Sequence, residues 1–175
     1  MKILSYLKAA KTEIKAAFTD IKDIDTHAGR LTERDIKQLM LRAPALRIAL
    51  LGSAKVESRL EGTSAIKCKF GCYIVTKNGQ QYKKDEQAMN IAEALIAFLD
   101  RFQPKGEGAK YLGQPAGNLR YDVMLSAGQN STGTMLSAVS WDAVITVGEG
   151  VFEETGPVIS KLYINDELIV GEPDV

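Results

Sequence analysis

The chain has 175 residues, of which 45% are hydrophobic and 25% are charged, and its 22 basic and 22 acidic residues cancel. This length and composition predict one globular domain with a sizeable core and exclude disorder along the whole chain. A nucleic-acid-binding protein usually carries a basic excess, and no segment approaches the roughly 20 consecutive apolar residues that cross a bilayer.

The first third of the chain predicts two helices. Residues 1–19 repeat apolar side chains at three- and four-residue steps, which is typical of an amphipathic helix. The segment Asp20–His27 follows as a short connection, in which Ile21 and Ile24 stand among acidic residues. Thr32-Glu-Arg-Asp is a capping sequence for a second, short helix, and Pro44 ends that helix.

Two strands and a long helix are predicted in the middle of the chain. From Ala45 the hydrophobic period changes to two, and the segment 66–75 alternates most clearly, which predicts two well-buried strands. Asn78-Gly79 is a turn signal. Asp85 is positioned to cap a helix over about Glu86–Phe102, which is apolar around more than half its circumference. We expect that helix to pack against the sheet and against a neighbouring subunit.

The last part of the chain predicts two further strands, 119–125 and 135–147, which pair antiparallel because their connection is short. After Gly150, apolar residues flank Asn165-Asp166, a hairpin signal. The expected fold is therefore α+β: a small, mostly antiparallel sheet of about four main strands packed against helices. Residues 1–150 form the core domain and residues 151–175 form a C-terminal hairpin or arm.

The two cysteines, Cys68 and Cys72, are predicted to be buried core residues. Charged residues follow Leu7 at once, so no secretory signal forms, and we expect free thiols in a reducing cytoplasm. Four residues along a strand span about 13 Å, whereas a disulfide needs Cα atoms within about 7 Å. His27 has no nearby group to orient it and is expected to be an ordinary loop histidine.

No catalytic or cofactor motif is complete. Ser53 lacks the G-x-S-x-G context of a nucleophilic serine. Gly128 and Gly133 have the spacing of a phosphate-binding loop, but Thr134 stands where its lysine would be, so the segment predicts a polar hairpin loop. We therefore expect neither an enzyme nor a bound metal or cofactor.

The order of elements resembles the tail-terminator proteins of long-tailed phages, especially the small neck protein of Mu-like phages. Three stretches within about residues 45–147 carry the likeness: Leu46-Arg-Ile-Ala-Leu-Leu-Gly52, Phe70-Gly-Cys-Tyr-Ile-Val-Thr76 and Ser137-Ala-Val-Ser-Trp-Asp-Ala-Val-Ile-Thr146. The resemblance implies a homo-hexameric ring on the tail tube, in a virion assembled in the host cytoplasm. Its other partners are the tail tube protein and the head–tail connector, and DNA passes through the ring without specific binding.

Polar loops and a terminal hairpin are suitable contact elements for such a ring. The residues predicted to bind partners are Gln129, Asn130, Ser131, Ile159, Leu162, Ile164, Leu168 and Val170. Two alternatives stay open. One is another ring component of the neck or tail tube, and the other is a small cytoplasmic module that binds a peptide or metabolite.

Overall fold

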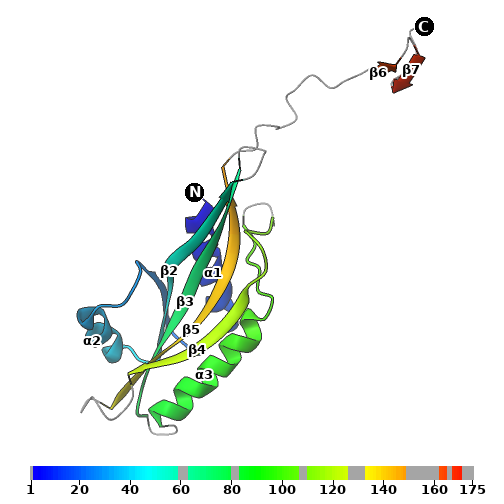
Figure 1. Cartoon of the computed structure of the whole chain (residues 1–175). Helices are drawn as coiled ribbons and strands as arrows, with labels where there is room; N and C mark the ends of the chain where they lie inside the picture. Colours follow the sequence, from blue (N-terminus) through cyan, green and yellow to red (C-terminus); the bar gives the residue numbers. More distant parts are fainter. Residues whose placement is uncertain are drawn as a thin grey trace.

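The structure is a computed structural model that describes residues 2–58, 63–79, 83–106, 110–125, 133–148, 162–164 and 167–170. Helices and strands follow one another along the chain (Figure 1). Their bounds are α1 Lys2–Ala17, β1 Asp23–His27, α2 Glu33–Leu41, β2 Ala45–Ser58, β3 Ser64–Lys77, α3 Lys84–Leu99, β4 Gly117–Leu125, β5 Thr134–Val147, β6 Leu162–Ile164 and β7 Glu167–Val170.

Strands β1 to β5 form one sheet in the order β1-β2-β3-β5-β4. β1 is parallel to β2, and the other neighbouring strands are antiparallel. The predicted α+β class with a mostly antiparallel sheet is confirmed. The strand number was underestimated, because the segment Asp20–His27 is not merely a connection: it contains β1. A parallel neighbour requires a crossover, and α2 lies within that crossover.

One face of the sheet is covered by α1 and α3 (Figure 1). Alternation along β3 directs Cys68, Phe70, Cys72 and Ile74 to this face, where all four are fully buried. The helices contribute every third or fourth residue to the same core: Tyr6, Ala10 and Ile14 from α1, and Ala92, Leu95 and Leu99 from α3.

The opposite face of the sheet is covered by α2 near Ala45 and Ala49 of β2, where Leu39 packs with Ala49, Tyr73 and Val75. The predicted capping sequence is confirmed. The Thr32 hydroxyl accepts a hydrogen bond from the Asp35 backbone N–H (3.3 Å), and the Asp35 carboxylate accepts one from the Thr32 N–H (2.9 Å). Both bonds satisfy backbone donors that the first turn of a helix leaves without partners.

The long helix begins earlier than predicted, at Lys84, and ends at Leu99. The Thr76 hydroxyl donates to the Lys84 carbonyl (2.8 Å), and the Asn78 side-chain oxygen accepts from the Lys84 N–H (3.2 Å). These contacts from β3 and its following turn hold the first residue of the helix. Within the chain only one stripe of α3 is buried, and Met89 and Ile96 on its flank are exposed.

Both strands of the predicted C-terminal hairpin are present. β6 and β7 pair antiparallel, with Ile164 opposite Glu167, and form a two-stranded sheet separate from the five-stranded one. The division into a core of residues 1–150 and an arm of residues 151–175 stays a prediction.

Candidate interaction surfaces

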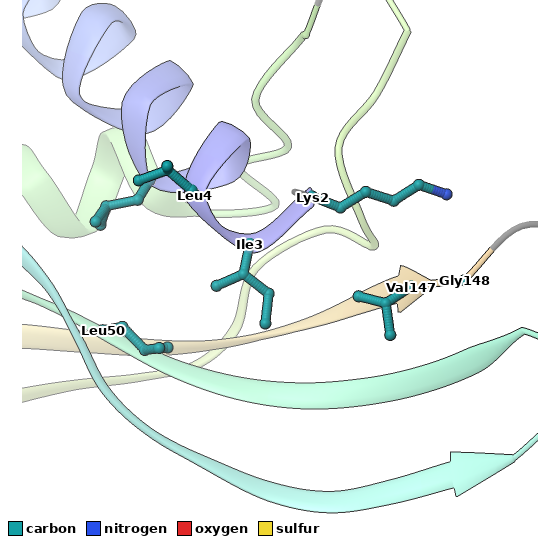
Figure 2. A pocket seen from close by; sticks show the side chains of 7 residues that line it. Lys2, Ile3, Leu4, Leu50, Val147 and Gly148 are labelled. Atoms are coloured by element: carbon teal, nitrogen blue, oxygen red, sulfur yellow. The ribbon is translucent and has the colours of Figure 1, made fainter.

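An apolar groove lies at the end of the sheet where β5 finishes. It has a volume of about 800 Å³ and opens between the first two turns of α1 and the sheet. Figure 2 shows Ile3 projecting from α1 between Leu50 of β2 and Val147 of β5. We call this the tip groove, and its lining residues are Lys2, Ile3, Leu4, Leu7, Leu50, Val147 and Gly148. Its apolar lining and its size are typical of surfaces that bind an apolar ligand or a peptide.

The outer edge of β2 is open beside the tip groove. β1 pairs with β2 only from Ala45 to Ala49, and beyond Ala49 no strand among the described residues pairs with this edge. Val56 lies opposite Ile66, and therefore on the face that α1 covers further down, yet it is more than half exposed. The strand thus offers, next to apolar side chains, an edge with which no described strand pairs, the usual setting for an added strand.

The other edge of the sheet is formed by β4. Phe98 of α3 points toward the end of α1, where its ring meets the Phe18 ring edge-on with centroids 6.0 Å apart. Met89 and Ile96 lie on the opposite flank of α3, and therefore on the flank nearer β4. Val123 of β4 lies opposite Ser137, on the α3 side of the sheet. We call Met89, Ile96, Val123 and Met124 the β4 edge patch. Met89 is 53% exposed and Val123 is 52% exposed, so this edge also has apolar surface that the described residues do not cover.

A polar recess of about 400 Å³ lies between α2 and the sheet. Contrary to the prediction, His27 is neither in a loop nor without an orienting group. It ends β1, and its Nε2 lies 3.3 Å from the Arg30 carbonyl oxygen and 3.6 Å from the Asp35 carboxylate. Arg47 at the floor of the recess is held by both carboxylate oxygens of Asp23, at 2.8 and 2.9 Å. The recess is therefore built from the Arg47–Asp23 ion pair, which joins β2 to β1, and from polar contacts of His27, which lie between β1 and α2.

The cysteines are core residues, as predicted. Both are fully buried on the α1–α3 side and neither forms a disulfide. Burial raises the pKa of the Cys72 thiol to about 12 and also raises that of Cys68, so neither thiol is a nucleophile near neutral pH. The sheet separates them from His27, which contacts α2 on the other face. Within the described residues, no group of three or more His, Cys, Asp or Glu side chains could hold a metal ion.

The partner-binding residues predicted from the sequence are not brought into a described site. Gln129, Asn130, Ser131 and Ile159 lie outside the described residues, and Leu162, Ile164, Leu168 and Val170 are described only as backbone of β6 and β7. The tip groove and the β4 edge patch were missed. One signal in the sequence could have indicated them. α1 and α3 carry more apolar residues than one buried stripe needs, and the additional ones include Leu4, Met89 and Ile96, which are exposed.

The sequence matches no protein-family model and no curated protein. None of the described helices is long and apolar enough to span a membrane. Inferences about function therefore start from the two uncovered edges of the sheet.

Proposed function

We propose that the protein is a non-enzymatic structural component of a phage virion: a tail terminator that forms a ring on the head-proximal end of the tail tube. In that position it stops tube polymerisation and joins the tail to the head connector. Its partners are further copies of itself, the tail tube protein and the connector, and DNA passes through the ring without specific binding.

The observation that carries the proposal is the presence of two unlike apolar surfaces on opposite edges of one open sheet. The open β2 edge lies on one side, with the tip groove next to it at the end of the sheet, and the β4 edge patch lies on the other side. A ring requires such a pair, because each subunit must meet its two neighbours through different surfaces. Contiguous apolar surface that a monomer leaves exposed is also typical of a protein–protein interface.

A double variant tests the ring. Met89→Glu with Val123→Glu places two charges in the β4 edge patch at positions already about half exposed, so folding should be unaffected. We expect the wild-type protein to form a ring by size-exclusion chromatography with mass detection, and the variant to stay monomeric with an unchanged melting temperature. Leu41→Glu is the control, because Leu41 on α2 is 81% exposed and lies on neither edge; it should assemble normally.

Terminator activity is tested separately, by negative-stain microscopy of tails assembled with and without the protein. Tails of uniform length with it, and of uncontrolled length without it, are expected. A wild-type protein that stays monomeric at high concentration and leaves tail length unchanged would contradict the proposal. Rings that leave tail length unchanged would instead favour another ring component of the neck or tube.

A module that binds a peptide or a metabolite is the second candidate, and the tip groove is the observation in its favour. Its size falls within the range of about 300–1,000 Å³ typical of ligand sites. A stable monomer that binds a small apolar compound, and loses that binding in Leu4→Asp, would support this candidate over the ring.

A further inference from the structure

The tip groove lies where the described core ends. Val147, the last residue of β5, and Gly148 both line it, so the chain leaves the core at the rim of the groove. The open edge of β2 runs beside it from Leu50 onward. An apolar cavity next to a strand edge that no described strand occupies is suited to an added β-strand, whose main chain pairs with the edge while alternate side chains enter the cavity.

The same chain has strands that need such a surface. β6 and β7 pair with each other in a sheet of two strands, and a two-stranded hairpin is only marginally stable alone in water. Both strands are rich in apolar residues: Leu162 and Ile164 in β6, and Leu168 and Val170 in β7. Burying those residues in a second surface would stabilise the hairpin.

The length of chain before the hairpin favours a groove on another subunit. A return to the groove of its own subunit starts from Gly148, which already lines that groove, and a turn of about two to five residues is enough for it. Residues 149–161 can instead reach up to about 45 Å when extended. That reach is about the length of β3, a 14-residue strand of about 46 Å at the usual rise per residue. The segment is therefore long enough to extend along a neighbouring subunit.

The net charges of the C-terminal segment and of the core also favour contact between them. Residues 149–175 contain seven acidic residues and one basic residue, a net charge of −6. Residues 1–148 contain 15 acidic and 21 basic residues, a net charge of +6. Lys2 lines the tip groove, and the exposed Lys8 and Lys15 continue along α1. Opposite charges favour the encounter of the acidic segment with this end of the core.

We propose that the tip groove receives the C-terminal hairpin of a second copy of this chain, with a strand of the hairpin added to the open edge of β2. The inference rests on the proposed ring, since the ring holds the two copies next to each other. It names what the tip-groove side of one subunit receives from its neighbour in addition to the β4 edge patch: an exchanged arm that joins the two subunits.

Cross-linking between two singly substituted proteins tests this contact. Leu4→Cys places a thiol at the groove, where Leu4 is 45% exposed, and Leu168→Cys places one on the hairpin. The two proteins are mixed at low concentration, concentrated and treated with a short bismaleimide. A covalent dimer on a denaturing gel, at least several-fold above either protein alone, is expected. The native cysteines are fully buried and should not react. Leu41→Cys mixed with Leu168→Cys is the control and should give no excess dimer.

Two results overturn the inference. An intrachain cross-link in the Leu4→Cys/Leu168→Cys double variant, with no dimer in the mixture, places the hairpin in the groove of its own subunit. No cross-link in either experiment shows that the groove has another occupant. Ring formation, measured by mass on the same samples, keeps the two proposals apart: rings without cross-links refute only the exchanged arm, and cross-linked rings that do not cap tubes refute only the terminator.

Discussion

Trp141 is the only tryptophan in the chain, and its indole N–H donates a hydrogen bond to the Tyr6 hydroxyl at 3.1 Å. Phe70 stacks on Tyr6 with ring centroids 4.5 Å apart and lies 5.9 Å from Trp141. Each residue comes from a different element, namely α1, β3 and β5, and all three are fully buried. This cluster stabilises the packing of α1 on the sheet.

Tyr6→Phe should destabilise the fold by about 1–3 kcal/mol, because it leaves the buried Trp141 N–H without its acceptor. The free energy of unfolding is measured in urea by Trp141 fluorescence. Tyr111→Phe is the matched control, since Tyr111 is 59% exposed and should lose almost nothing. Equal stability of Tyr6→Phe and the wild type would show that the hydrogen bond contributes nothing net.

Replacing both cysteines by alanine removes buried volume from the core and should cost on the order of 1–3 kcal/mol. The effect should be confined to stability, with assembly unchanged at temperatures where the variant is folded. Metal in the purified wild-type protein that disappears from the Cys68→Ala/Cys72→Ala variant together with assembly would contradict a purely structural role.

Stability should also fall at alkaline pH. Burial raises the pKa of Cys72 from 9.0 to about 12, and it is the largest cause of the rise of the Tyr6 pKa from 10.0 to about 12. Between these values the folded chain keeps protons that the unfolded chain has lost. The free energy of unfolding therefore decreases as pH rises above about 9. In the Cys68→Ala/Cys72→Ala variant the decrease should begin only near pH 10; an onset at the same pH as in the wild type would contradict this account.

At the scale of elements, α2 depends on its N-terminal cap. Thr32→Ala removes the hydroxyl that accepts from the Asp35 N–H and should cost roughly 0.5–2 kcal/mol. Thr32→Ser keeps an oxygen in place and is the control. The loss should appear in urea unfolding, and a variant as stable as the wild type would mean that solvent replaces the cap without cost.

The outer face of α3 should be sensitive to charge during assembly. Ala97 is exposed on the isolated subunit, and we expect a neighbouring subunit to cover it in the ring. Ala97→Glu should lower the ring fraction at a given concentration while leaving the melting temperature unchanged. Gln38→Glu introduces the same charge change on the exposed side of α2 and should assemble normally. Normal assembly of Ala97→Glu would show that this face points to solvent.

Elements with strong local patterns could be predicted, and those that depend on distant partners could not. β3 alternates plainly where exposed Lys67 and Lys69 flank buried Cys68, and it becomes a continuously buried run from Phe70 to Thr76, so both parts read locally as a strand. β1 has one well-buried side chain, Ile24, and becomes a strand only because β2 pairs with it. The start of α3 at Lys84 depends in the same way on Thr76 and Asn78.

At the scale of the whole molecule, surplus apolar residues on α1 and α3 could indicate that uncovered surfaces exist, but where these surfaces lie was beyond prediction for a related reason. The tip groove exists because α1 covers β2 near Leu50 but leaves Val56 exposed further along the strand. That depends on where the helix crosses the sheet, which no local pattern encodes. The open edge of β2 likewise follows from the different lengths of β1 and β2.

Ending the chain at Gly150 tests the role of the whole C-terminal arm. If the arm joins subunits, the shortened protein should keep the melting temperature of the monomer and fail to dock onto tail tubes. The full-length protein under the same conditions is the reference. A monomer that loses several degrees and still docks would show that the arm belongs to its own core.

The pairing of β3 with β5 runs over 14 residue pairs without a shift, whereas the pairing of β2 with β3 is shifted at two places beyond Leu50. Amide hydrogen exchange should therefore be slowest in β3 and β5, since exchange there requires opening of the central pair. Amides of β2 beyond Ala49 that point away from β3 should exchange quickly in the monomer. Their protection on assembly, residue by residue, would record which part of this edge receives a new strand.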